Sequence, residues 1–159
     1  MKIIFQEKQS VKLPWVRAFV VFLAFLAWLF LILQIILDIK FGNNPAPDFV
    51  IIIVFILVGL GLPCLMFSAN LKTTITEEKI ILKYYPFLIK EIKRDKIIKV
   101  RATDYQPIKK YGGWGIRTNF KNTRAYTTDG HRGVIITLKN GSNILIGSRK
   151  AKNLVRALK

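Results

Sequence analysis

Two long uncharged runs of apolar residues limit what this chain can fold into. The first, residues 18–37, reads AFVVFLAFLAWLFLILQIIL, and Gln34 is its only polar side chain. The second, residues 49–67, reads FVIIIVFILVGLGLPCLMF and contains no charged residue. As an α-helix each run is about 30 Å long, which matches the hydrocarbon core of a bilayer. We therefore expect two transmembrane helices, over residues 18–37 and 49–69, that form a hairpin.

A buried core helix and a cleavable signal peptide are the alternatives for such runs. Two uncharged runs of this length exceed what the core of a small soluble domain uses. The first run is also longer than the apolar part of a signal peptide, and no small-residue cleavage site follows it before the second run. Both observations favour membrane spans.

The charge distribution predicts the orientation of the hairpin. The chain carries 26 Lys and Arg against 9 Asp and Glu, a net charge of +17. The segment between the runs has Lys40 against two aspartates, whereas residues 1–17 and the part after Asn70 have a large excess of cations. Cationic flanks remain on the cytoplasmic side. The prediction is a multi-pass protein of the plasma or inner membrane with both termini in the cytoplasm.

The chain is thus expected to have three parts: a basic N-terminal arm (1–17), a transmembrane hairpin (18–69) and a cytoplasmic domain (70–159). Strand-like patterns cover residues 71–76, 79–85, 87–93 and 97–103. Later, residues 133–139 and 142–147 flank Asn140-Gly141, a strong hairpin signal because Asn-Gly suits turns that need positive φ. Residues 128–130 (TDG) also indicate a turn.

The last segment has the pattern of an amphipathic helix. Ser148 is a good N-cap, and one face is apolar with Ala151, Leu154, Val155 and Leu158. The cations of the other face are Arg149, Lys150, Lys152, Arg156 and Lys159. A helix of this kind covers a sheet. The expected fold is a small β-barrel or sandwich of about seven antiparallel strands, with this C-terminal helix packed on it.

This order of features resembles bacterial membrane proteins with a pleckstrin-homology-like (PH-like) domain. The resemblance covers residues 14–159. It rests on two apolar runs followed by LKTTITEEKIILKYYPF, IKRDKIIKV, YGGWGIR, GVIITLKNGSNILIGS and a short terminal helix. It implies a PH-like fold after two N-terminal spans, and a membrane location. That family is largely uncharacterised, so the resemblance brings no catalytic residues with it.

The segment YGGWGIR, residues 111–117, holds three glycines between aromatic residues. A phosphate-binding loop places its glycines before a helix, often with Lys-Ser/Thr, whereas here an extended pattern follows. Two interpretations stay open. The segment is either a glycine-rich bend with Trp114 or Ile116 packed in the barrel, or an exposed tip at the lipid headgroups. The residues of the tip are Lys109, Lys110, Tyr111, Trp114 and Arg117.

Other chemistry finds little support in the sequence. His131 is the only histidine and lies in a polar turn, Cys64 is the only cysteine, and the acidic residues show no catalytic spacing. We expect no catalytic, metal-binding or cofactor-binding residues, and hence no enzyme and no cofactor. No helix-turn-helix, zinc finger or RNA-binding pattern supports a nucleic-acid partner. Gly59 and Gly61 in the second run favour close helix packing, with Pro63 as a kink.

The expected function is a non-enzymatic, membrane-anchored PH-like module for binding or scaffolding at the cytoplasmic membrane surface. Its ligand would be an anionic lipid headgroup or a protein segment. The alternative is an accessory or regulatory subunit of a larger membrane complex, such as a transporter or envelope machine. Self-association through Gly59 and Gly61 or through a sheet edge is a third kind of partnership.

Overall fold

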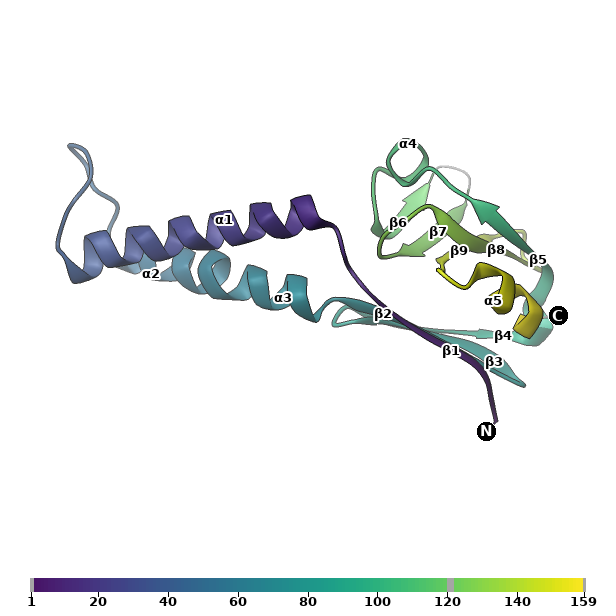
Figure 1. Ribbon diagram of the computed structural model, residues 1–159. Coiled ribbons are helices and arrows are strands. Elements are labelled where there is room, and N and C mark those ends of the chain that lie inside the picture. Colours follow the sequence, from purple (N-terminus) through teal and green to yellow (C-terminus); the bar gives the residue numbers. More distant parts are fainter. Residues whose placement is uncertain (1, 120–121, 159) are drawn as a thin grey trace. The chain divides into compact units, whose positions relative to one another are not determined.

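The structure is a computed structural model that describes residues 2–119 and 122–158 (Figure 1). Lys159, one of the cations expected on the C-terminal helix, lies outside these residues. The chain divides into two compact units. The helical unit is Lys12–Ser68, and the β unit combines the residues up to Val11 with those from Ala69 onward.

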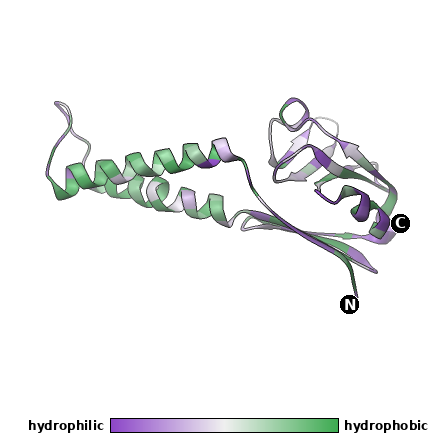
Figure 2. Cartoon of the chain, in the orientation of Figure 1, coloured by the Kyte–Doolittle hydropathy of each residue, from purple (hydrophilic) through white to green (hydrophobic). Residues whose placement is uncertain are grey.

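The helical unit contains two helices that are long and apolar enough to cross a membrane, of 23 and 21 residues. The first runs through α1 (Pro14–Leu31) and the π-helical η1 (Ile32–Ile36). The second runs through α2 (Asp48–Val54), the π-helical η2 (Phe55–Gly61) and α3 (Leu62–Ser68). Figure 2 shows that both are hydrophobic along nearly their whole length. Only 6% of the most apolar window of the second helix is buried, which argues against a soluble core helix.

Gln34 fixes the loop that joins the two helices. Its side chain is buried, and its Nε2 donates to the carbonyl oxygen of Ala46 at 2.5 Å and to Oδ1 of Asp48 at 3.2 Å. Asp48 begins the second helix, where a carboxylate is favourable beside the helix dipole. The one polar side chain of the first apolar run is therefore used to bond the start of the partner helix.

The two predicted packing glycines have different surroundings. A β-carbon on Gly59 would lie 3.5 Å from Cβ of Ala27 on the first helix and 2.8 Å from the ring of Phe55. A β-carbon on Gly61 would meet only the carbonyl oxygen of Ile56, on its own helix. Gly59 thus sits in the helix–helix contact, while Gly61 lies in the wide π-helical turn just before Pro63. Such a turn relieves the clash between a proline ring and the carbonyl four residues earlier.

The first sheet of the β unit is a four-stranded antiparallel sheet in the order β1-β2-β3-β4. Its strands are β1 (Ile3–Ser10), β2 (Asn70–Thr76), β3 (Lys79–Tyr85) and β4 (Leu88–Lys93). Residues 1–17 are therefore not one separate arm, because Ile3–Ser10 pairs along β2 and Pro14 already begins α1. The sequence does not predict this strand, because two of its inward-facing residues, Glu7 and Gln9, are polar and interrupt the expected alternation of apolar and polar residues.

The second sheet has five strands in the order β5-β8-β9-β7-β6. After the short 3₁₀ helix η3 (Arg94–Lys96), the chain forms β5 (Ile97–Asp104), α4 (Pro107–Tyr111), β6 (Gly115–Asn119), β7 (Thr123–Thr127), β8 (Arg132–Leu138) and β9 (Asn143–Gly147). The β8–β9 hairpin is confirmed, but only Gly141 of its turn has positive φ. Hydrogen bonds from Leu138 N–H to Ser142 O and from Gly141 N–H to Leu138 O enclose a three-residue loop, residues 139–141, which Asn-Gly also suits.

Nine strands among the described residues replace the expected seven, and β7 pairs with β9 in parallel. The additional strands are β1 and β7, whereas the extended pattern after the glycines of YGGWGIR anticipated β6. The two sheets share one core with the terminal helix α5 (Ala151–Leu158), which is labelled in Figure 1. The predicted apolar face of α5 is confirmed, since Leu154 and Leu158 are buried and Ala151 and Val155 pack beside them. The core side chains are Leu71, Ile75, Ile80, Leu82, Tyr84, Ile92, Tyr126, Val134, Ile136, Ile144 and Ile146.

Removal of β1 tests whether it is part of the β unit. A chain of residues 69–159 lacks β1, the strand that pairs with β2 beside Leu71 and Ile75. We expect circular dichroism to show that this chain is unfolded. Replacing residues 12–68 with Asn-Gly joins β1 to β2 by a two-residue turn, because Val11 N–H already donates to Ala69 O at 3.4 Å. We expect this variant to fold cooperatively; equal behaviour of the two chains would contradict the role of β1.

The contrast between the glycines gives a second prediction. Gly59→Ala overpacks the contact with Phe55 and Ala27, and we expect a loss of about 1–3 kcal/mol in the stability of the helix pair. Gly61→Ala, the matched control, faces only its own helix and should cost less. Thermal unfolding of the full chain in detergent, followed by size-exclusion chromatography, measures both. Equal losses would show that Gly59 has no special contact.

Candidate functional site

The YGGWGIR segment follows a helix rather than preceding one. Helix α4 ends at Gly112, which has φ +70° and whose N–H donates to Ile108 O, while Gly113 N–H donates to Pro107 O. These bonds satisfy the last carbonyl groups of α4, where the helix dipole is negative. The glycines therefore turn the chain into β6, and their amides do not form a helix N-terminus that attracts phosphate.

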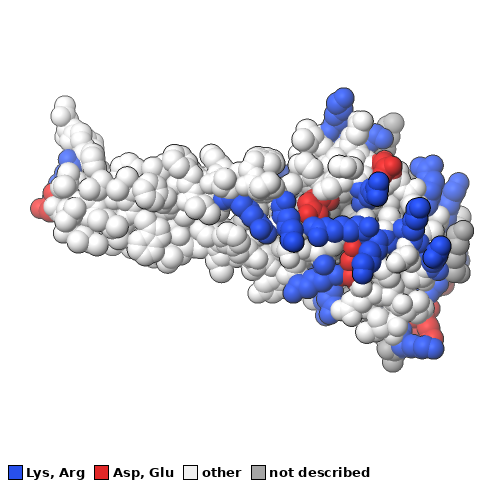
Figure 3. Space-filling model, in the orientation of Figure 1, with Lys and Arg blue, Asp and Glu red and all other residues white. Residues whose placement is uncertain are grey.

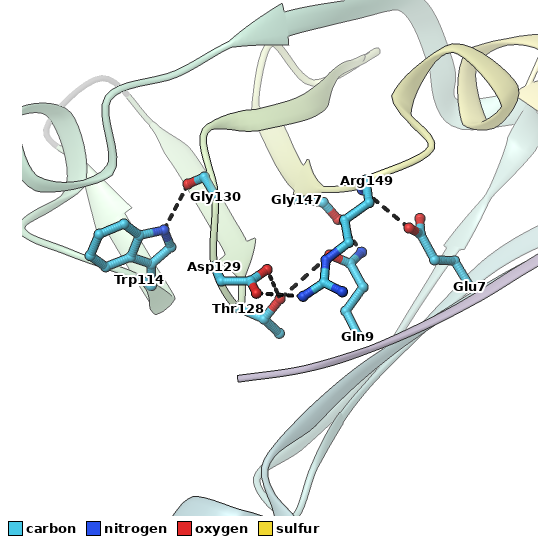
Figure 4. A network of polar contacts seen from close by, with 8 residues as sticks. All are labelled: Glu7, Gln9, Trp114, Thr128, Asp129, Gly130, Gly147 and Arg149. Carbon is cyan, nitrogen blue, oxygen red and sulfur yellow. Dashed lines mark hydrogen bonds and ion pairs between the residues drawn. The ribbon is translucent and has the colours of Figure 1, made fainter. Parts of the chain in front are cut away.

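The two aromatic side chains of this loop hold it against the β unit. The half-buried Trp114 donates from Nε1 to the carbonyl oxygen of Gly130 at 2.8 Å (Figure 4). The ring of Tyr111 meets the ring of Tyr105 edge to face at 6.4 Å. Burial raises the pKa of Tyr105 to about 12, so its phenol stays neutral in this small apolar cluster with Ala125. The aromatic residues therefore anchor the loop, as the interpretation as a glycine-rich bend expects for Trp114, while a position at the lipid headgroups stays a prediction.

The remaining residues of the predicted tip face outward. Lys109, Lys110 and Arg117 are exposed, together with the apolar side chain of Ile108. The Arg117 guanidinium donates from Nε to Trp114 O at 3.3 Å. Its charge also acts on Tyr84: burial raises the pKa of Tyr84, and the positive Arg117 partly offsets that rise. Ile116 is exposed as well, so it is not packed in the core. The loop and the end of α4 therefore present cations and two isoleucines, held in place by Tyr111 and Trp114.

A second exposed apolar feature, which the sequence patterns did not indicate as a site, is the turn between β3 and β4. Tyr85, Phe87 and Ile89 are 58%, 61% and 65% exposed. The turn is closed by a hydrogen bond from Phe87 N–H to Tyr84 O at 2.8 Å. In the sequence, the feature that could have indicated this site is Tyr-Pro-Phe, residues 85–87, in which a proline lies between two aromatic residues. Neighbouring exposed apolar side chains of this kind mark contact surfaces more often than scattered single ones do.

The strand register places both loops at one end of the β unit. Ser10 pairs with Asn70, and Asn70 pairs with Tyr85, so the β3–β4 turn lies at the sheet end where β1 finishes and β2 starts. Tyr84 donates from its hydroxyl to Thr127 O at 3.2 Å, which joins this end to the end of β7 beside the YGGWGIR loop. The chain leaves β1 for α1, and enters β2 from α3, at this same end.

Three lysines lie in one row on the outer face of the first sheet. Lys8 pairs with Lys72, and Lys72 pairs with Lys83. The residues directly before and after Lys72 and Lys83 on their strands are buried and point into the core. Next to the row, a groove of about 650 Å³ continues past Asn70 to the exposed β3–β4 turn. Figure 3 shows Lys and Arg gathered over the β unit on the face in view, whereas most of the helical unit is uncharged.

A polar network joins β1 to the start of α5 (Figure 4). The buried carboxylate of Glu7 accepts hydrogen bonds from Ser148 Oγ at 2.6 Å and from Arg149 N–H at 3.1 Å. Gln9 donates from Nε2 to Gly147 O at 2.9 Å. Ser148 also accepts from Lys150 N–H at 3.1 Å. Because α5 begins at Ala151 and Lys150 O accepts the first helical bond, from Leu154 N–H, the N-cap position predicted for Ser148 belongs to Lys150, and Ser148 lies two residues before it.

The pocket beside this network contains the one histidine. Its lining includes His131, Asp129, Ser148 and Arg149. Asp129 is engaged by the Arg149 guanidinium, and Ser148 by Glu7. Within residues 2–119 and 122–158, no hydrogen bond joins His131 to either of them, and no three His, Cys, Asp or Glu side chains are grouped to hold a metal ion. These contacts join β1 to the residues that precede α5, which suits a structural role better than acid–base chemistry.

Comparison of the chain with family models, curated proteins and solved structures found no match.

The buried carboxylate provides a stability test. Glu7→Ala leaves the Ser148 hydroxyl and the Arg149 N–H without their acceptor, and we expect a loss of about 2–3 kcal/mol in the free energy of unfolding. Gln6→Ala, on the same strand but exposed, is the control and should change stability little. Chemical denaturation of the chain with residues 12–68 replaced by Asn-Gly measures both. A loss below about 0.5 kcal/mol for Glu7→Ala would contradict the role of the network.

Proposed function

We propose that this protein is an integral membrane protein with two spans, whose PH-like β unit binds the anionic lipid surface of the cytoplasmic leaflet. It acts as a non-enzymatic binding or scaffolding module. The observation that carries the proposal is the position of the exposed Tyr85 and Phe87. They lie at the sheet end from which the chain leaves for one apolar helix and to which it returns from the other.

Short connections support this proposal. Three residues separate β1 from α1, and one residue separates α3 from β2. At no more than about 3.6 Å per residue, such tethers keep this end of the β unit close to the ends of the helices. If the helices span a bilayer, Tyr85 and Phe87 come within reach of its interface, which aromatic side chains prefer. Lys109, Lys110 and Ile108 project from the same end of the β unit.

Charge supports the same orientation. The residues after Asn70 carry 21 Lys and Arg against 6 Asp and Glu, whereas the loop between the helices has nearly balanced charges. An anionic leaflet attracts each nearby lysine or arginine by about 1 kcal/mol. The excess therefore favours a cytoplasmic β unit that is held against the inner leaflet. The network of Glu7, Gln9 and Arg149 keeps the first strand in place while the surface binds.

Depth measurement in nanodiscs tests the proposal with the full chain. In a Cys64→Ser background, a fluorescent label on Phe87→Cys should be quenched by bromine-labelled lipids in discs that contain phosphatidylglycerol. The same label on Asn140→Cys, in the turn at the opposite end of the β unit, should not be quenched. Equal quenching at the two positions, or none at position 87, would overturn the proposal and direct the search to protein partners such as a larger membrane complex.

Charge removal tests the role of the loop cations. Lys109→Gln with Lys110→Gln removes about 2 kcal/mol of attraction to the anionic lipid. We therefore expect the ratio of membrane-bound to unbound β unit to fall by up to roughly thirtyfold, and the quenching of the label at position 87 to decrease. Added salt should have the same effect. The matched control is Lys96→Gln with Lys139→Gln, where Lys139 N–H donates to Lys96 O at the opposite end of the sheet. If both pairs act equally, only net charge matters and the loop has no specific role.

A further inference from the structure

The row of Lys8, Lys72 and Lys83 has a charge arrangement that the fold itself does not need. Directly paired residues of antiparallel strands have β-carbons about 5 Å apart, and like charges at such positions destabilise a sheet. No salt bridge involves any of the three among the residues that the structure describes. The nearest acid on this face, Glu91 in the next row, is bound to Lys79 at 2.7 Å.

Protection of a sheet edge does not explain the row. Lysines on edge strands discourage pairing with other chains, and Lys8 on β1 fits that role. Lys72 and Lys83, however, lie on β2 and β3, which have hydrogen-bonded strands on both sides. Threonine or glutamine at these two positions would give a soluble face without the repulsion. The arrangement instead suits an anion that is shared by several ammonium groups.

The surroundings of the row indicate an amphiphilic anion. The groove that contains the lysines also contains Tyr85, Phe87 and Ile89, all exposed. In the register, Lys83 faces Ile89, and Tyr85 lies two residues further along the same face of β3. A ligand with a phosphate at the lysines could therefore place apolar groups on the aromatic turn. This turn lies at the end of the sheet where the chain connects to both apolar helices.

We infer that Lys8, Lys72 and Lys83 bind the headgroup of a phospholipid that ends in a phosphomonoester, while its glycerol and upper acyl chains contact Tyr85, Phe87 and Ile89. This inference rests on the proposed function and adds the ligand class. A phosphomonoester carries between one and two negative charges near pH 7 and has three acceptor oxygens. It can therefore accept hydrogen bonds from several ammonium groups, each a compact donor. A phosphodiester headgroup offers one charge and fewer free oxygens.

The binding test uses the full chain in detergent with dioctanoyl phosphatidic acid, followed by native mass spectrometry. Lys72→Thr with Lys83→Thr should weaken binding at least tenfold. Lys99→Thr with Arg101→Thr, a pair of cations on β5 in the other sheet, should leave binding within twofold of the wild type. Threonine suits strands, so the variants should fold. An unchanged affinity of the first variant, or an equal loss in the control, would overturn the inference.

Two further measurements complete the test. Without lipid, Lys72→Thr should raise the melting temperature by about 1–3 °C, because the repulsion in the row is removed. An unchanged or lower melting temperature would show that the row carries no repulsion, and would overturn the argument that the lysines serve an anion. Dioctanoyl phosphatidylglycerol should bind at least fivefold more weakly than phosphatidic acid. Equal binding of glycerol phosphate or inorganic phosphate would overturn the lipid assignment and identify a soluble anion instead.

The outcomes also separate this inference from the proposed function. If the label at position 87 is quenched in nanodiscs but the lysine variants bind phosphatidic acid normally, the surface contact stands and the lysine site is wrong. If position 87 is not quenched while the lysine variants lose binding, the site exists but the proposed orientation is wrong.

Discussion

The pairing of β1 with β2 is the interaction on which the rest of the structure depends. These strands are adjacent in the sheet, yet the whole helical unit lies between them in the chain. Closing a long loop costs entropy, but a helix pair that brings its own ends together reduces that cost. Within the helical unit, the Arg17 guanidinium lies 5.6 Å from the centre of the Phe67 ring, so the start of α1 and the end of α3 are neighbours.

This pairing has a consequence for any function at a surface. Because the helical unit is inserted between two antiparallel neighbours, the β unit has two covalent tethers, both at one end of one sheet. A domain with one tether can rotate freely about its linker, whereas two short tethers restrict rotation. Tyr85 and Phe87 lie at the end of the sheet that carries both tethers, and the row of lysines starts two residues away. The proposed lipid contact follows from this restriction together with charge.

Buried polar groups secure the inserted strand. Glu7 and Gln9 occupy inward-facing positions at which a strand usually has apolar residues. Glu7 accepts from the Ser148 hydroxyl and the Arg149 N–H, and Gln9 donates to Gly147 O. A buried carboxylate is costly unless its hydrogen bonds are formed, so it favours one register of β1 over slipped alternatives. The same bonds hold the residues that lead into α5. The strand that precedes the helical unit and the helix that covers the core therefore stabilise each other.

The sequence alone determined the features that depend on local pattern. Two uncharged runs predicted the long helices, Asn140-Gly141 predicted the hairpin, and Ser148 with the i, i+3, i+4 pattern predicted α5. The glycines of YGGWGIR pointed to a turn, and an extended strand follows them as expected. These features need only hydrophobic periodicity, capping and φ preference, which neighbouring residues supply.

Only the tertiary structure decided which distant segments are neighbours. β1 was hidden because Glu7 and Gln9 break the apolar alternation of its inward face, and their partners lie about 140 residues away. The lysine row was invisible for a related reason: Lys8, Lys72 and Lys83 are scattered along the chain and meet only through register. The partner of the Trp114 indole, the carbonyl oxygen of Gly130, is likewise distant along the chain. Pairing between strands is a long-range property, because it is set by which buried faces and polar partners fit together.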